Sequence, residues 1–179
     1  MRIIAGKYNR RFIKPPKDLP VRPTTDLARE SLFNILNSRF DLEGKSVLDL
    51  FSGTGAVAYE FVSRGCGEVW AVDSNNRCTS FIKKTVAEFQ IDELTVFRND
   101  VFKFLQTVKK KFDIIFADPP YDMEQLDLLP KIVMESHLLN EGGVFVLEHS
   151  KVYNFSSYPG FTDHRKYGKV NFSFFQPEI

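Results

Sequence analysis

Residues 118–121, Asp-Pro-Pro-Tyr, combine a carboxylate, two prolines and an aromatic ring at the end of an apolar run. The run over residues 112–117 is typical of a buried strand. The prolines cannot donate hydrogen bonds to a strand ladder, so they end the strand and stiffen the turn that follows it. Because open α/β sheets bind ligands beyond the carboxyl ends of their strands, this turn is predicted to carry a functional site.

The chemistry that suits this turn acts on an amino group attached to a flat ring. Such an amine is a poor nucleophile because its lone pair is delocalised, and two acceptors holding its N–H bonds would draw it toward a tetrahedral shape. We predict that Asp118 and the Pro119 carbonyl are these acceptors and that Tyr121 stacks on the base. The motif alone leaves open the alternative of an ordinary strand-ending turn with an exposed aspartate.

A second motif is typical of a nucleotide-like cofactor site. A predicted strand over residues 46–51 leads into Ser-Gly-Thr-Gly at 52–55 and then into a helix that begins near Ala56. Gly53 and Gly55 permit a sharp turn and a close approach to a ligand, and the helix N-terminus adds unpaired N–H groups. With Ala58 in the third position, the spacing satisfies G-x-G-x-x-G/A.

Polar residues follow the next two predicted strands. Asp73 ends a strand over residues 68–72, about twenty residues after the Gly turn, where a carboxylate accepts from both ribose hydroxyls; the alternative is a plain turn residue. Asn99 and Asp100 follow a strand over residues 94–97. They are predicted either to contact an adenine edge or to cap a helix that starts at Val101, and both alternatives stay open.

The remaining pattern completes an α/β fold. Helices are expected over residues 26–38, from Ser74 or Asn75 to Phe89, and over residues 123–139, with Thr25 or Asp26 as the first N-cap. A fifth strand is expected at 144–148, after a turn at 140–143. Five strands alternating with helices predict a doubly wound, parallel sheet. Two β-like runs around residues 167–169 predict an antiparallel hairpin at its edge.

The first part of the chain is basic. Residues 1–22 carry seven Lys or Arg against one Asp, whereas the 179-residue chain has a net charge of only +1. We expect residues 1–23 to form a hairpin arm outside the core, and residues 24–179 to form one domain. The charge favours a polyanionic partner over a solvated tail. Five basic residues are predicted to contact its phosphates: Arg2, Lys7, Arg10, Arg11 and Arg22.

Other function classes have little support in the sequence. The two cysteines and three histidines lack metal-ligand spacing, and G-x-S-x-G does not occur, so neither a metal site nor a hydrolase triad is expected. No apolar run approaches membrane-spanning length and no secretory signal is recognisable. We expect a cytoplasmic protein without membrane contact.

Taken together, DLFSGTG at 49–55, Asp73, DPPY at 118–121 and the closing hairpin resemble the class I adenosylmethionine-dependent methyltransferases. RIIAGKYNRR, RPTTDLARESLFNIL and HRKYGKVNFSFF further resemble the bacterial 16S ribosomal RNA guanine-N2 methyltransferases. The resemblance covers nearly the whole chain. It implies a Rossmann-like, mostly parallel seven-stranded sheet with a reversed last strand, and a guanine amino group held by the 118–121 turn.

The resemblance also implies a cofactor and a partner. S-adenosylmethionine is expected over the Gly turn with its ribose on Asp73. The predicted cofactor-binding residues are Asp49, Phe51, Gly53, Gly55, Asp73, Asn99 and Asp100. The expected partner is 16S ribosomal RNA or an assembly intermediate of the small subunit, bound by a monomer.

Three rival functions have weaker support in the sequence. A nicotinamide-dependent oxidoreductase shares the Gly turn and Asp73 but has no use for the 118–121 motif or the antiparallel tail. A non-catalytic RNA-binding domain accounts for the basic arm but does not need a ribose carboxylate. An adenine-N6 methyltransferase also uses a D-P-P-Y motif, and only the whole-chain resemblance favours guanine over adenine.

Overall fold

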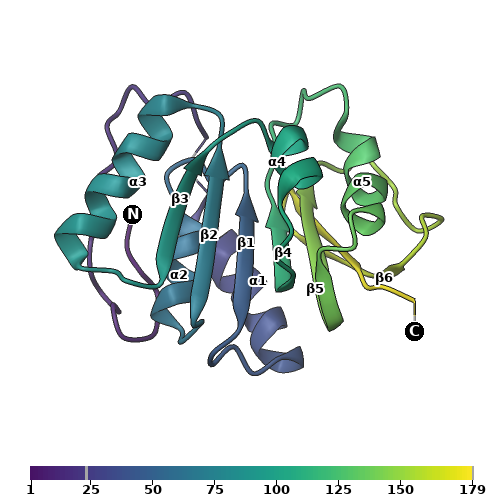
Figure 1. Cartoon of the computed structure of the whole chain (residues 1–179), viewed down its shortest axis with the longest axis horizontal. Helices are drawn as coiled ribbons and strands as arrows, with labels where there is room; N and C mark the ends of the chain where they lie inside the picture. The colour runs from purple at the N-terminus through teal and green to yellow at the C-terminus, as the bar shows by residue number, and fades with distance from the viewer. Residues whose placement is uncertain (23, 179) are drawn as a thin grey trace.

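The computed structural model describes residues 1–22 and 24–178, which form one mixed sheet covered by helices on both faces (Figure 1). The seven strands lie in the order β3-β2-β1-β4-β5-β7-β6. The elements in chain order are α1 Asp26–Arg39, β1 Ser46–Leu50, α2 Ala56–Ser63, β2 Glu68–Asp73, α3 Asn76–Phe89, β3 Leu94–Arg98, α4 Val101–Thr107, β4 Phe112–Ala117, η1 Leu126–Leu128, α5 Leu129–Glu135, β5 Leu139–His149, β6 Phe161–Tyr167 and β7 Val170–Phe175.

The direction of the strands confirms the expected architecture. Strands β1 to β5 pair in parallel, and β7 is inserted antiparallel between β5 and β6. Parallel neighbours need crossover helices, whereas the β6–β7 hairpin needs only the short turn that contains Gly168. The predicted seven-stranded, mostly parallel sheet with an antiparallel C-terminal hairpin is therefore correct.

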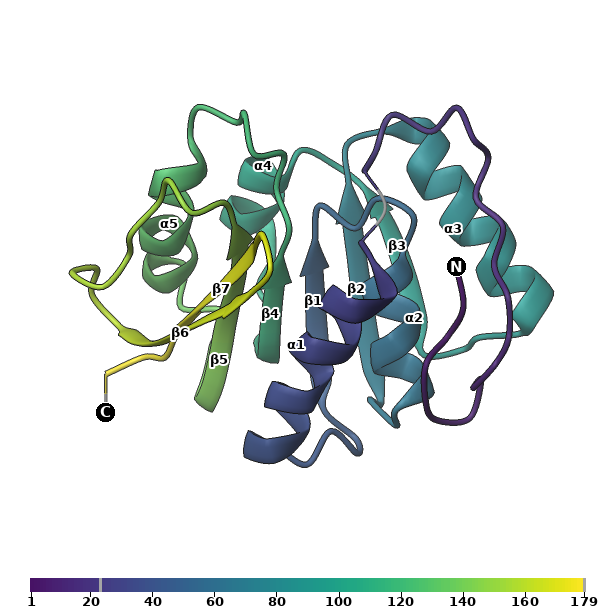
Figure 2. The same ribbon diagram turned by 180° about the vertical axis from the view of Figure 1, so that it is seen from behind.

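Alternation along each strand divides the core into two layers. Val47, Ile114 and Val146 pack with α1, α2 and α3 on one face, which Figure 2 shows from the front. Leu48 and Ile115 point the other way and pack with α4 and α5. Successive side chains of a strand point to opposite faces, so any polar residue at a strand end belongs to a definite layer.

The helix caps follow the predicted residues. The Thr25 side chain accepts a hydrogen bond from the Ala28 amide and caps α1. The Asn75 side chain accepts from the amides of Arg77 and Cys78 and caps α3. Each cap satisfies N–H groups that have no partner within the helix.

The segment between β4 and β5 differs from the prediction. Instead of one helix over residues 123–139, it contains η1 and the shorter α5, with Pro130 in the first turn of α5. The expected turn at 140–143 is part of β5, which begins at Leu139. Gly142 has a φ of +73°, and the β4–β5 register shifts between Phe112 and Ile114, so these residues form an irregularity within the strand.

The basic N-terminal segment also differs from a free arm. Its two halves meet at a single antiparallel bridge, between Arg2 and Phe12. Ile3 and Ile13 are only 2% and 4% exposed and belong to the main core, so the expectation that this segment stays outside the core is wrong. The amides of Ile4 and Ala5 donate to the buried Glu60 carboxylate of α2 and fix the segment there.

Within the part of the chain that the structure describes, no helix is long and apolar enough to cross a membrane.

Candidate active site

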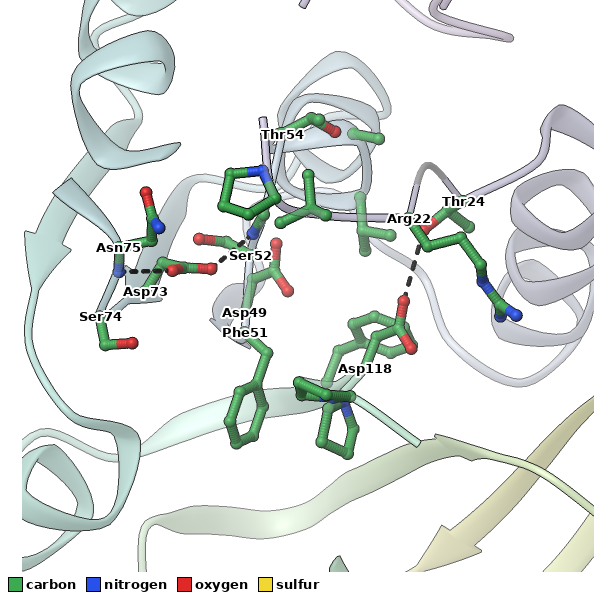
Figure 3. A pocket seen from close by; sticks show the side chains of 18 of the residues that line it. Arg22, Thr24, Asp49, Phe51, Ser52, Thr54, Asp73, Ser74, Asn75 and Asp118 are labelled. Carbon is green, nitrogen blue, oxygen red and sulfur yellow. Dashed lines mark hydrogen bonds between the residues drawn. The ribbon is translucent and has the colours of Figure 1, made fainter. Parts of the chain in front are cut away.

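A cavity of about 620 Å³ lies beyond the carboxyl ends of β1, β2 and β4 (Figure 3). Asp49 of β1 is in register with Ala71 of β2, so Asp73, two residues further along β2, points to the same face as Asp49. Asp49 is also in register with Phe116 of β4, and Asp118 follows Phe116 by two residues. Strand alternation therefore places three carboxylates along one wall of the cavity.

The Gly turn between β1 and α2 is held by Asp73. The Gly53 amide donates to Asp73 Oδ2 at 2.9 Å, and the Asn75 amide donates to Asp73 Oδ1 at 2.8 Å. Gly55 has a φ of +83°, and a Cβ built there would lie 2.7 Å from Cζ of Tyr59, so both the backbone and the space require glycine. Gly55 does not line the cavity itself but shapes the turn that does.

Asp49 is the most buried of the three carboxylates, at 1% exposure. Its Oδ2 has no hydrogen-bond partner among the described residues, although Asp49 lines the cavity. Burial raises the pKa of Asp49 well above its ordinary value, and the nearby charges of Asp118 and Asp73 raise that pKa further. A buried, unpartnered carboxylate beside a cavity suits a ligand that brings positive charge and an N–H donor.

The 118–121 turn begins with Asp118, which is half-buried. Asp118 Oδ2 accepts a long hydrogen bond, 3.5 Å, from the Thr24 hydroxyl. Burial raises the pKa of Asp118 to about 7, while the Arg22 guanidinium and the Thr24 hydrogen bond act in the opposite direction. The cavity is lined by Asp118, Pro119 and Tyr121 together with Asp49, Phe51, Gly53 and Asp73, so the three predicted catalytic residues share it with four of the seven predicted cofactor residues.

Two further side chains hold Tyr121. The Arg22 guanidinium carbon lies 4.6 Å from the centre of the Tyr121 ring, and the Tyr121 hydroxyl lies 3.5 Å from Glu148 Oε1. Glu148 is 2% exposed, and burial together with the Asp118 charge raises its pKa to about 8. Tyr121 is thus fixed between a cation over its face and a carboxyl group at its hydroxyl.

Glu148 and Thr24 were missed in the sequence. Thr24 stands in the RPTTD stretch, but its contact with Asp118 joins residues 94 positions apart. Glu148 stands in no recognisable motif, and its signal lies in the strand register. Phe116 pairs with Val146, so Glu148, the next-to-last residue of β5, and Asp118, just after β4, each stand two residues beyond this pair. A carboxylate at the end of an apolar strand, in phase with a carboxylate on the neighbouring strand, is the pattern that identifies Glu148.

Besides Gly55, two predicted cofactor residues lie outside the cavity. The Asp100 side chain accepts from the Lys103 amide at 3.0 Å and caps α4, so of the two alternatives the cap is present. Asn99 donates its amide to the Asp73 carbonyl at 3.1 Å and lines a separate hollow beside Trp70. A contact of Asn99 or Asp100 with an adenine edge stays a prediction.

The five predicted RNA-binding residues are spread along the N-terminal segment. Arg22 lines the cavity, and Arg2 pairs with Asp26 in the first turn of α1 at 3.1 Å. Lys7 pairs with Glu93, which precedes β3 and therefore lies at the amino ends of the parallel strands, whereas Asp73 lies at their carboxyl ends. The segment then runs along α3 toward the cavity (Figure 2).

The other two arginines lie near the Lys7 end. Arg11 packs over the rings of Tyr8 and Phe89, and Arg10 stands in the same turn with a φ of +66°. Only part of the basic segment is therefore beside the cavity, and a role in RNA binding stays a prediction for all five residues.

Among the described residues, no group of three or more His, Cys, Asp or Glu side chains could hold a metal ion.

Comparison with known proteins gives one family match and several relatives. The family model described as Conserved hypothetical protein 95 matches residues 1–176. YlbH of Bacillus subtilis, which bears the name of a candidate rRNA methyltransferase, is 34% identical over 155 residues, 84% of this chain and 83% of that protein. The ribosomal RNA small subunit methyltransferase D of Buchnera aphidicola is 29% identical over 154 residues, 86% of this chain and 78% of that protein.

A solved structure supports the fold assignment. The 16S rRNA N2 methyltransferase of Thermus thermophilus, in complex with AdoMet and guanosine, has a TM-score of 0.71 at 22% identity. The match covers 87% of this chain and 44% of that chain. At this identity the likeness concerns the fold, which is the Rossmann-like fold of the class I methyltransferases.

Proposed function

We propose that this chain, which belongs to the family described as Conserved hypothetical protein 95, methylates the exocyclic N2 amino group of a guanine in 16S ribosomal RNA. The coarser assignment is an S-adenosylmethionine-dependent methyltransferase of ribosomal RNA, in agreement with the names of its relatives. The observation that carries this proposal is the position of the 118–121 turn, which shares one cavity with the Gly turn and Asp73. An amine-binding turn and a nucleoside-binding turn are thereby within reach of each other.

The residues of the Gly turn fit the cofactor. S-adenosylmethionine would supply an activated methyl group on a sulfonium and would also bring an ammonium group and a ribose. The unpartnered Oδ2 of Asp49 suits a cationic donor, and each oxygen of Asp73 keeps a lone pair beside its backbone hydrogen bond. We assign the cofactor to Asp49, Phe51, Gly53 and Asp73, with Gly55 setting the shape of the turn.

The residues of the 118–121 turn act on the amine. Asp118 and the Pro119 carbonyl accept its two N–H bonds, which frees the lone pair for attack on the methyl carbon. Attack by the amine on the methyl group of bound S-adenosylmethionine would form the N–C bond while the S–CH3 bond breaks, with S-adenosylhomocysteine as the leaving group. The nitrogen becomes positive, and the Asp118 carboxylate stabilises this charge before a proton leaves the nitrogen for solvent. Tyr121, held by Arg22 and Glu148, keeps the ring in the plane that aims the amine.

The choice of guanine rests on the resemblance of the whole chain and on the small-subunit relative. An adenine N6 amine would also satisfy two acceptors, so adenine-N6 methylation is the second candidate. We further propose that the protein acts in the cytoplasm as a monomer, on 16S ribosomal RNA or on a small-subunit assembly intermediate.

A labelling experiment tests the function. The protein is incubated with S-adenosylmethionine that carries a labelled methyl group, in parallel with unmodified 16S rRNA, 23S rRNA and 30S particles. The proposal expects label in 16S rRNA or in 30S particles and in guanosine after digestion. Label confined to 23S rRNA, label in adenosine, or no label in any RNA would contradict it.

A further inference from the structure

A second cavity, of about 460 Å³, lies beside the loop of residues 150–160 that joins β5 to β6. Asn171 and Ser173 of β7 line it, and they alternate with Phe172 and Phe174, which pack in the layer of α1 and α2. The cavity therefore lies on the opposite face of the sheet from Asp118. Figure 2 shows the β6–β7 hairpin and this loop at the far end of the sheet from α3. The volume is in the range of small-ligand sites.

The polar floor of this cavity is only partly satisfied. His149 Nε2 lies 2.7 Å from Ser173 Oγ, and its Nδ1 lies 2.8 Å from the Ser150 carbonyl. His164 Nε2 lies 3.0 Å from Asn171 Oδ1. Asn171 is only 3% exposed, and its Nδ2 has no partner among the described residues. Buried amides are rarely left unpaired, so Asn171 is suited to a ligand atom that accepts a hydrogen bond.

The walls and rim suit a flat, anionic ligand. The partly exposed Tyr153 ring lies parallel to Phe155, with 5.9 Å between centroids and 6° between planes, and a further flat ring can stack on Tyr153. Lys151 lines the cavity from the loop. Lys166 is exposed on β6 and stands in register with Asn171, so it belongs to the same face. Aromatic stacking, an amide donor and lysines at the rim together match a nucleotide.

The position of the cavity connects it with the active site. Asn171 is in register with His149, the residue after Glu148, at the carboxyl end of β5. The strands β4, β5 and β7 are neighbours, so Asn171 is two strand spacings, about 10 Å, from the strand end that carries Asp118. A short run of single-stranded RNA spans this distance.

We propose that the second cavity binds a nucleotide that flanks the target guanine in the same RNA strand. The base stacks on Tyr153 and accepts a hydrogen bond from Asn171, while Lys151 and Lys166 contact phosphates. This inference rests on the proposed function, because it takes the RNA substrate as given. It assigns to the loop after β5 and to the β6–β7 hairpin a role in binding the substrate and none in the chemical step.

Steady-state methyl transfer to unmodified 16S rRNA tests the proposal with Tyr153→Ala. Loss of one base–aromatic stack raises KM for RNA by about five- to 150-fold. The value of kcat and the affinity for S-adenosylmethionine are expected to stay at wild-type level, and Tyr153→Phe is expected to restore KM. The matched control is Val152→Ala, since Val152 is 77% exposed in the same loop and does not line the cavity.

A second variant covers the case in which Tyr153→Ala fails to fold. Lys151→Ala changes an exposed side chain, and it should lower the slope of log affinity against log salt for 16S rRNA by nearly one unit, measured by fluorescence anisotropy without cofactor. An unchanged KM in a folded Tyr153→Ala variant, an equal rise in Val152→Ala, or an unchanged salt slope in Lys151→Ala would overturn the proposal. Wild-type protein that binds 16S rRNA but transfers no methyl group would instead overturn the proposed function.

Discussion

Replacing Asp73 by Asn is the substitution that most directly tests the cofactor site. The two Asp73 oxygens accept from the amides of Gly53 and Asn75, so an asparagine keeps one of these acceptors and presents an N–H group where the other stood. The variant also loses the negative charge that we assign to the ribose hydroxyls. Asp73→Asn therefore perturbs both the Gly turn and the ribose contact.

The size of the effect follows from these contacts. A hydrogen bond to a charged group contributes about 1.5 to 3 kcal/mol, which corresponds to a loss of affinity of roughly ten- to over a hundredfold. The facing N–H groups cost about 1 to 3 kcal/mol in addition if the turn cannot move. We expect Asp73→Asn to weaken binding of S-adenosylmethionine by at least tenfold, and Asp73→Ala to do the same.

Isothermal titration calorimetry with S-adenosylmethionine measures this loss, and thermal unfolding reports on the fold. The matched control is Asp92→Asn, because Asp92 is an exposed aspartate just before β3, at the amino ends of the parallel strands and away from the cavity at their carboxyl ends. Wild-type affinity in a folded Asp73→Asn variant would refute the assignment of the ribose to Asp73.

Three other predictions concern the chemistry, the buried carboxyl groups and the basic segment. Asp118→Ala should lower the single-turnover rate of methyl transfer by two or more orders of magnitude and leave cofactor affinity unchanged, because the interaction of the Asp118 carboxylate with the amine strengthens in the transition state. A near wild-type rate would rule out Asp118 as the amine acceptor. The pKa of Glu148 is raised from an ordinary 4.5 to about 8. Between these pH values the folded state keeps a proton that the unfolded state releases, so the contribution of Glu148 to the free energy of unfolding falls as the pH rises from 4.5 to 8. Glu148→Gln should then stabilise the protein at pH 9 by at least about 1 kcal/mol in urea unfolding, and the absence of any gain would place the carboxyl in a more polar setting. Arg10→Ala with Arg11→Ala should reduce both RNA affinity and its salt slope at constant cofactor affinity, whereas wild-type values of both would remove these arginines from the RNA-binding surface.

The strand ends were predictable from the sequence because their signals are local. Apolar runs that stop at Asp73 and at Asp118 define the two strands that flank β1, and parallel pairing with β1 then brings both carboxylates to the carboxyl ends of the strands. The Gly turn was predictable for the same reason, since Gly53 and Gly55 occur between a strand and a helix.

Contacts between distant segments were not predictable. Charge marked the first 22 residues as an arm, but Ile3 and Ile13 are buried because Glu60, more than 50 residues away, accepts from the backbone between them. Glu148 closes an apolar strand and carries no motif, and its place beside Tyr121 depends on the pairing of β5 with β4. Asn140 to Gly143 have turn composition, yet Leu139 before them and Val144 after them both pair with β4, so β5 continues across this irregularity.

We propose that the 118–121 turn holds the N2 amine of a guanine in 16S rRNA for methylation. Mass spectrometry of nucleosides from 16S rRNA, after incubation with S-adenosylmethionine and either the wild-type protein or Asp118→Ala, tests it most directly. N2-methylguanosine is expected with the wild-type protein, and little or none with the variant. N6-methyladenosine as the product, or equal amounts of N2-methylguanosine from both proteins, would contradict it.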